Sequence, residues 1–193
     1  HAQRKREEER KPPAIPLSEN VHVDEDEDQQ KCPWIVICFM PRTSDYSPAE
    51  FQTQLTEQET ALQTMTPQQY ITNRAGIVGA GTTDVARNSP KAKLAYRQIW
   101  SDYKRKFPNQ NYDGLAALHA LDIVAGGDPA NYLRIGPQRE NGIIGAQWSQ
   151  GRGVKGGDRL NRLDVHDASL QASGCRTVNA CVRVCPVRGL AAN

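Results

Sequence analysis

One apolar stretch, residues 114–127 with the sequence GLAALHALDIVAGG, constrains the fold more than any other part of the chain. It ends in Gly126 and Gly127, as helices often do, and its aliphatic side chains would surround a helix axis. The stretch therefore predicts a buried helix. In such a helix His119 and Asp122, three residues apart, project from the same side. An imidazole and a carboxylate are costly to bury unless they pair, bind a metal or line a wet cleft.

Two interpretations of this histidine–aspartate pair follow. In the functional one, His119 is a general base or metal ligand, and Asp122 orients it or binds the metal. In the structural one, the imidazole and the carboxylate satisfy each other by a hydrogen bond in the core. The carboxylate favours a protonated ring and burial opposes it, so the pKa of the histidine could lie near neutral. The turn that follows, with Asp128, adds a carboxylate and backbone amides, and it favours the functional interpretation.

Further helices are predicted by N-cap residues that stand directly before prolines, at Ser47, Thr66 and Ser89. A residue of this kind satisfies a free amide of the first turn, and proline fits the first helical position. The predicted helices are residues 48–65, residues 67–75 before a glycine-rich run at 76–83, residues 90–107 with a buried stripe of Leu94, Ile99 and Trp100, residues 144–148 and residues 158–171.

Two strands are predicted near the ends of the chain. Residues 32–39 form a β-branched and aromatic run, and residues 178–185 alternate apolar with polar side chains, so the two could pair. Residues 128–141 and 151–157 are polar or glycine-rich and predict loops. The fold class is therefore α+β: a mostly helical single domain with a small sheet formed by the N- and C-terminal strands.

The charge is unevenly distributed along the chain. Residues 1–31 hold six basic and nine acidic residues with nothing able to build a core, and they predict a disordered linker before a domain at 32–193. Residues 86–193 hold sixteen basic and eight acidic residues, an excess that attracts polyanions such as nucleic acid or forms an ordinary solvated surface. No stretch approaches the roughly 18 apolar residues of a membrane span, so we expect no membrane partner.

The cysteine count limits the redox and metal chemistry of the chain. There are five cysteines, and an odd number excludes complete pairing within the chain. A zinc site built from Cys175, Cys181 and Cys185 is one alternative, but no second closely spaced pair of cysteines supports it. Buried or incidental thiols are the other alternative.

Three segments resemble a known family. The sequence HALDIVAGGDP at residues 119–129 closely resembles the histidine–aspartate signature of the polymorphic toxin type 15 family. Upstream, Tyr70, Asn73 and Arg74 are similar to that family's Tyr-x-x-Asn-Arg element, and downstream residues 145–148 resemble its Gly-x-Gln-Trp element. The order and spacing are also similar, over roughly residues 38–186.

The resemblance implies a bacterial toxin domain that degrades DNA in a rival cell. Such domains follow an upstream delivery module in the same polypeptide, are secreted through a type VI or related system, act in the target-cell cytoplasm and are neutralised by a cognate immunity protein. The resemblance makes His119 and Asp122 the catalytic motif and a divalent cation, Mg²⁺, the cofactor. Alternatives are an RNase toxin of the same delivery system and a non-catalytic module that binds DNA or protein.

Roles for individual residues follow from what phosphodiester hydrolysis needs: an activated water, neutralised phosphate charge and a stabilised leaving oxygen. His119 could deprotonate the water. Asp122 and Asp128 could hold Mg²⁺, with His119 as a further ligand. Each remaining candidate could equally serve a structural role: Arg74 in catalysis and Arg139 in substrate binding by clamping phosphate, and Asn73 and Gln147 in substrate binding by hydrogen bonds. No base-reading motif is present, which predicts little sequence specificity.

Overall fold

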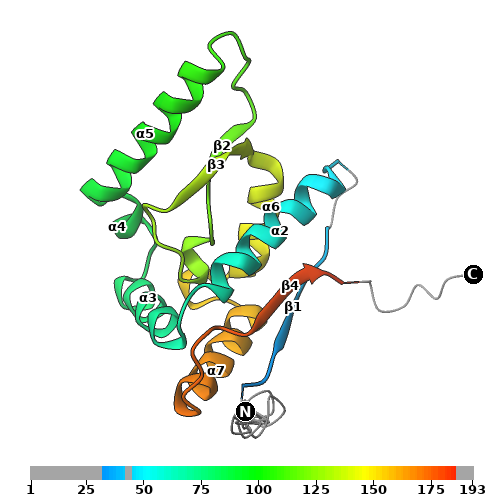
Figure 1. Ribbon diagram of the computed structural model, residues 1–193, viewed down its shortest axis with the longest axis vertical. Coiled ribbons are helices and arrows are strands. Elements are labelled where there is room, and N and C mark those ends of the chain that lie inside the picture. The colour runs from blue at the N-terminus through cyan, green and yellow to red at the C-terminus, as the bar shows by residue number, and fades with distance from the viewer. Residues whose placement is uncertain (1–31, 42–44, 186–193) are drawn as a thin grey trace, which may run out of the picture.

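The computed structural model describes residues 32–41 and 45–185, so the predicted linker at 1–31 lies outside the described residues. In the described part of the chain, four helices follow the first strand, and the other three strands lie in the second half with two further α-helices (Figure 1). In chain order the elements are β1 (Ile35–Phe39), α2 (Pro48–Gln63), α3 (Pro67–Ala80), α4 (Asp84–Arg87), α5 (Pro90–Lys106), β2 (Leu115–His119), η1 (Ile123–Ala125), β3 (Tyr132–Pro137), α6 (Gln138–Ser149), η2 (Gly153–Lys155), α7 (Asp158–Ala172) and β4 (Ala180–Val184).

The predicted class, a mostly helical α+β domain, is confirmed, and so is the pairing of the terminal strands. β1 and β4 run parallel, with Ile35 opposite Ala180 and Phe39 opposite Val184 (Figure 1). A second two-stranded sheet, the antiparallel pair β2–β3, was not predicted. Within the part of the chain that the structure describes, no helix is long and apolar enough to cross a membrane.

Two disulfides fasten β1 to the C-terminal end of the domain. Cys32 is bonded to Cys175 and Cys38 to Cys185, across 143 and 147 residues of sequence. Cys181 is a free thiol. The zinc alternative is therefore wrong, because two of its three thiols are consumed by disulfide bonds.

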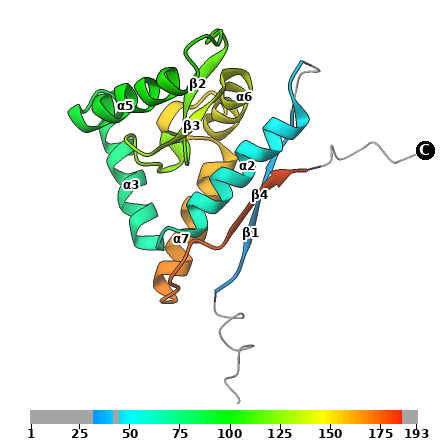
Figure 2. The same ribbon diagram turned by 45° about the horizontal axis from the view of Figure 1, so that its top comes forward.

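The main core lies between the β1–β4 pair and the helices α2, α6 and α7 (Figure 2). Phe39 and Trp148 pack edge to face, with ring centroids 4.9 Å apart, and both are fully buried. The Trp148 indole satisfies its buried N–H by donating to Gln58 Oε1 at 2.6 Å. Such pairing removes the cost of burying a polar group, so the aromatic body contributes its full hydrophobic stabilisation.

The prediction of a helix over residues 114–127 is wrong. The first half is strand β2, paired to β3 so that Leu115 lies opposite Pro137 and His119 opposite Tyr132; the second half is the 3₁₀ turn η1. A short apolar run suits a strand as well as a helix, and here a cross-strand partner decides. That partner lies within residues 128–141, which had been interpreted as a loop.

The two glycines at the end of this stretch serve the turn. Gly126 has φ +92°, a left-handed conformation that L side chains rarely adopt. A Cβ atom on Gly127 would overlap the carbonyl oxygen of Leu121. The pair therefore ends a 3₁₀ turn by a close backbone approach and does not cap an α-helix.

Several helix boundaries also differ from prediction. α3 continues through the glycine-rich run to Ala80, because burial of Ile77 offsets the cost of the glycines. α6 begins at Gln138, well before the predicted residue 144, and η2 lies inside the expected loop at 151–157. The predicted buried stripe of α5 is wrong: Leu94 is 62% exposed, Ile99 and Trp100 are half-buried, and Ala92 is the one fully buried residue of that helix.

Candidate functional site

The connection from β2 to β3 carries the histidine and both candidate aspartates. His119 ends β2, beside an irregularity in the strand register, and Asp122 is the N-cap of η1. The residues of η1 are buried in the core, and η1 packs between α3 and α6. This anchoring holds the connection rigidly against the hydrophobic core, while Asp128 lies exposed at its outer turn.

The His119 ring is half-buried and neutral. Its Nε2 lies 3.1 Å from the carbonyl oxygen of Pro129; since a carbonyl can only accept, Nε2 carries the hydrogen and Nδ1 keeps its lone pair. The pKa of His119 is lowered to about 4, chiefly by burial and to a lesser extent by the charge of Arg87. The hydrogen bond to Pro129 and the charge of Asp128 act in the opposite direction and raise the pKa. At neutral pH the ring can therefore accept a proton or bind a metal through Nδ1.

Asp122 turns one carboxylate oxygen into the turn and leaves the other facing a cavity. Oδ1 accepts a hydrogen bond from the Val124 amide at 2.9 Å. Oδ2 faces Gly145 of α6, where a Cβ atom would stand only 2.9 Å away. The carboxylate lines a cavity of about 300 Å³ together with Arg87 and Ser149. Burial raises the pKa of Asp122, while the Val124 hydrogen bond and the Arg87 charge lower it.

The expected His119–Asp122 hydrogen bond is not among the contacts of the described residues. The prediction relied on both side chains projecting from one face of a helix, and a strand followed by a turn does not provide that face. Each side chain has its own backbone partner instead. The structural interpretation, a mutually satisfied core pair, is therefore wrong, and so is the expectation that Asp122 orients His119.

Arg87 is a site residue that sequence reasoning missed. It ends the four-residue helix α4, is exposed, and lies near enough to lower the pKa values of both His119 and Asp122. Within the described chain no carboxylate forms an ion pair with it. Its position depends on how α4 folds back over the β2–β3 connection, and the only local signal was a basic residue just before the Ser89 cap.

Arg74 is a buried residue of α3 whose guanidinium supports the β2–β3 connection. It is 4% exposed, and its Nε and Nη2 atoms donate to the two carboxylate oxygens of Asp164 at 3.0 and 2.9 Å. Nη1 donates to the carbonyl oxygens of Val124 at 2.6 Å and Val154 at 3.0 Å. Four of the five guanidinium N–H groups are thereby used. The side chain is placed to position η1, two residues from Asp122, and not to clamp a phosphate.

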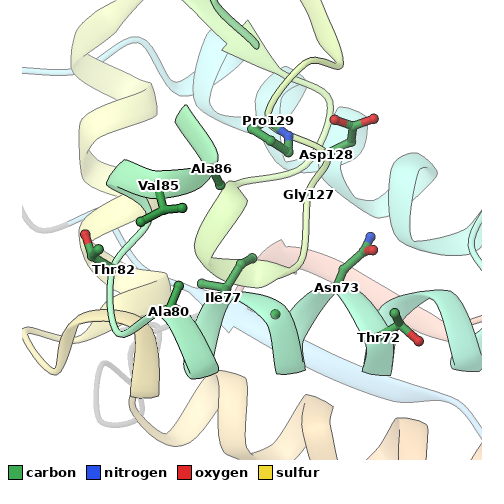
Figure 3. Close-up of a pocket in the computed structure, with 11 residues that line it drawn as sticks. Thr72, Asn73, Ile77, Ala80, Thr82, Val85, Ala86, Gly127, Asp128 and Pro129 are labelled. Atoms are coloured by element: carbon green, nitrogen blue, oxygen red, sulfur yellow. The ribbon is translucent and has the colours of Figure 1, made fainter. Parts of the chain in front are cut away.

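Asn73 and Asp128 stand at the meeting point of two hollows. One is a groove of about 430 Å³ between α3, α4 and the turn at 127–129 (Figure 3), and the other is a hollow of about 270 Å³ beside Asn131. Asn73 Nδ2 donates to the Gly126 carbonyl oxygen at 2.9 Å. Asp128 accepts from the Ala130 amide at 2.8 Å and from Lys91 Nζ at 3.1 Å.

The two remaining candidates direct their interactions elsewhere. Arg139 forms an exposed ion pair with Asp45 at 3.2 Å. Gln147 is buried; its amide nitrogen donates to the Met40 carbonyl oxygen at 2.7 Å, and its Oε1 accepts from the Met40 amide at 2.9 Å and from Arg159 at 3.1 Å. Gln147 thus joins the end of β1 to α6 and α7.

The two carboxylates fit a hydrated magnesium ion and do not fit a metal that needs three or more protein ligands. In the described part of the chain no three His, Cys, Asp or Glu side chains gather closely enough to form a metal cage, so the expected joint site of Asp122, Asp128 and His119 is not formed. Mg²⁺ needs only one or two carboxylates, because it keeps several of its waters. Asp122 Oδ2, which has no hydrogen-bond partner among the described residues, and the exposed carboxylate of Asp128 each offer such a ligand, in different cavities.

These features define a small α+β domain in which a neutral histidine, two carboxylates and an arginine without an ion-pair partner among the described residues lie on or beside the β2–β3 connection. A family comparison assigns it more closely. The chain belongs to the Novel toxin 15 family, whose model matches residues 46–185, from just before α2 to just after β4. It is therefore a polymorphic toxin domain, and the resemblance noted over residues 38–186 is confirmed. No curated protein matches the chain.

Proposed function

We propose that this domain is a metal-dependent nuclease that hydrolyses DNA phosphodiester bonds in a rival cell. The observation that carries the proposal is the neutral His119, whose Nδ1 is unprotonated beside the charge of Arg87 and the carboxylate of Asp128. A hydrolase of phosphodiesters needs a base and a cation close together, and the groove beside Asp128 gives a substrate strand a way in.

His119 acts as the general base on the attacking water through Nδ1. In the free protein the pKa of His119 is too low for a strong base, but an anionic phosphate arriving nearby favours the protonated ring and raises it. The O–H bond of the water breaks, its oxygen bonds to phosphorus, and the bond from phosphorus to the leaving oxygen breaks. The leaving oxygen takes a proton from a solvent water on its own side of the phosphorus, and His119 releases its proton to solvent once the product phosphate has left.

Arg87 and Asp122 supply the electrostatics around the phosphate. The Arg87 guanidinium offers paired N–H donors to two phosphate oxygens, a geometry that suits anionic oxygens better than a lysine does. Asp122 or Asp128 would hold Mg²⁺ through a carboxylate oxygen, with waters as its other ligands. When bound, that ion neutralises phosphate charge and makes its waters more acidic. Asn73 and Arg74 keep the connection in place through Gly126 and Val124.

The proposed function also requires that the toxin be delivered to the rival cell and that its producer be protected. As a polymorphic toxin, the domain would follow a delivery module, leave the producing bacterium through a type VI or related secretion system and act in the target-cell cytoplasm. A cognate immunity protein would protect the producer. Co-expression of the domain with its neighbouring gene product in a test bacterium should restore growth that the domain alone abolishes.

The deciding experiment is cleavage of supercoiled plasmid with Mg²⁺ or EDTA. We expect wild type to nick the plasmid only with metal. H119A and D122N should each lose about a hundredfold or more in rate, as removal of a catalytic base or a charged ligand does. H166A is the matched control, because His166 is also half-buried and its Nε2 likewise lies 3.1 Å from a carbonyl oxygen, that of Asn179.

Folding of each variant is checked by circular dichroism, and a labelled RNA of the same sequence is run beside the DNA. Cleavage that survives EDTA or H119A in a folded protein would overturn the mechanism. Cleavage of RNA with DNA left intact would reassign the toxin to ribonucleases. If folded wild-type protein cuts neither DNA nor RNA, the domain is a non-catalytic binding module.

A further inference from the structure

Helix α5 begins at the proposed catalytic site and leads away from it. Near its start, Lys91 Nζ is bonded to Asp128 at 3.1 Å. One turn on, the Tyr96 ring contacts Tyr132 at a centroid distance of 5.9 Å, and Tyr132 stacks against His119 at 4.2 Å. From there α5 runs along the β2–β3 hairpin, on the side of the molecule away from β1 and β4 (Figures 1 and 2).

One exposed side of α5 carries a stripe of cations. At about 100° per residue, Lys93, Arg97 and Lys104 fall within roughly 40° of one another around the helix. All three side chains belong to exposed residues. The ion pairs that α5 forms within the described chain involve other residues, Lys91 with Asp128 and Arg105 with Asp102. The three charges of this basic stripe are therefore not compensated by a carboxylate of the described chain.

An aromatic cluster lies beside the stripe and packs the helix against its neighbours. Trp100 packs edge to face against Tyr96, Tyr103 and Tyr112, with centroids 6.2 to 6.4 Å apart. The Lys104 ammonium lies 5.6 Å from the Trp100 ring centre and 5.4 Å from that of Tyr112. These rings contact one another and the lysine, so they are not displayed as platforms on which unpaired bases stack. What the face offers to a ligand is positive charge.

We propose that the basic stripe, Lys93, Arg97 and Lys104, binds the sugar–phosphate backbone of duplex DNA and holds it in line with the catalytic site. The proposal rests on the nuclease function proposed above. From Lys93 to Lys104 the helix rises about 16 Å, and a duplex carries about ten phosphate charges over that length. Each cation can therefore face a phosphate. Contacts of this kind position the duplex without reading its sequence.

The test measures duplex binding without cleavage. A fluorescein-labelled duplex of 30 base pairs is titrated with the full 193-residue chain in EDTA, at several NaCl concentrations, and followed by anisotropy. The stripe variant is K93Q/R97Q/K104Q. The matched control, R162Q/R176Q/R183Q, removes the same charge from exposed residues of α7, the following loop and β4. Thermal melts verify that both variants fold.

We expect the stripe variant to bind at least tenfold more weakly at 0.1 M NaCl. The slope of log K against log salt should fall by about 2.7, since each phosphate contact contributes about 0.9. The control should stay within about twofold of wild type in affinity and lose less than one unit of slope. Equal losses in the two variants, or none in the stripe variant, would overturn the proposal.

Plasmid nicking with Mg²⁺, run on the same three proteins, separates this proposal from the nuclease assignment. If wild type nicks and the stripe variant binds like the control, the stripe is refuted and the nuclease stands. If wild type binds through the stripe but never cuts, the nuclease is refuted and the stripe stands. If wild type neither binds nor cuts, both are refuted.

Discussion

The neutral state of His119 makes a direct prediction about its titration. Burial lowers the pKa of this ring to about 4, and the nearby charge of Arg87 lowers it as well. We expect the His119 imidazole resonances, assigned by comparison with H119A, to titrate near pH 4 in an NMR experiment. In R87Q a positive charge is gone, so the midpoint should move to higher pH. A midpoint near 6.5 in both proteins would contradict the burial described here.

The same shift affects stability. An unfolded histidine binds a proton near pH 6.5, whereas the folded ring does so only near pH 4. The unfolded state therefore holds more protons between these values, and the free energy of unfolding should fall as the pH is lowered from 6.5 to 4. This contribution should be absent from H119Q, which urea unfolding at pH 4.5 and 7 can measure against wild type.

Asp167 predicts the opposite pH dependence. It is fully buried in α7, neither carboxylate oxygen has a hydrogen-bond partner in the described structure, and burial together with the charge of Asp164 raises its pKa to about 7. Between about pH 4 and 7 the folded state holds the extra proton, so this residue destabilises the fold as the pH rises. D167N should therefore gain stability over wild type at pH 8, on the order of 2–4 kcal/mol, and little at pH 4.

Urea unfolding of both proteins at the two pH values measures this difference. The matched control is D113N, which changes an exposed aspartate. An equal gain for D167N at pH 4 and pH 8 would mean that its carboxylate is not protonated in the fold.

At the level of single elements, α3 offers a matched pair of glycines. A Cβ atom at Gly76 or Gly79 would meet no atom within 4 Å, and both sit in a helix, where alanine is more stable by about 0.5–1 kcal/mol. Of the two, Gly76 lines the groove beside Asp128. G76A and G79A should both raise the unfolding free energy, whereas G76A alone should raise KM for DNA. The unfolding free energy of both variants is measured first. If G76A and G79A then have equal KM values for DNA, the groove is not the substrate path.

Element starts could be predicted from local sequence, because their signals are local. The side chains of Ser47, Thr66 and Ser89 accept hydrogen bonds from the third residue after each, as N-cap residues should. The structure of residues 114–127 could not be predicted in this way, because pairing with β3 decides it. For the same reason the sequence singled out His119 and Asp122 but placed them wrongly on one helix face, and it missed Arg87, which packing of α4 brings near them.

At the scale of the whole molecule, the two disulfides make a prediction about non-additivity. Cys32–Cys175 and Cys38–Cys185 close nearly the same loop of 143 and 147 residues, because both tie β1 to the end of the chain that pairs with it. Once either bond has closed the long loop, the other closes only a short one of roughly 15–20 residues. By chain entropy the first bond contributes about 5 kcal/mol and the second about 3 kcal/mol.

Either single variant, C32S/C175S or C38S/C185S, should therefore lose about 3 kcal/mol of unfolding free energy, and the quadruple variant more than twice as much. The β2–β3 hairpin, which carries the proposed site, lies against α3, α5 and α6 and not on β1, so a protein that remains folded after reduction should still cut plasmid at low temperature. Reduction with TCEP, followed in parallel by melting and by nicking, checks both statements. In a reducing target-cell cytoplasm, where we propose that the toxin acts, it would then lose stability but keep its proposed site, because the disulfides fasten the β1–β4 sheet and the site lies on the β2–β3 connection.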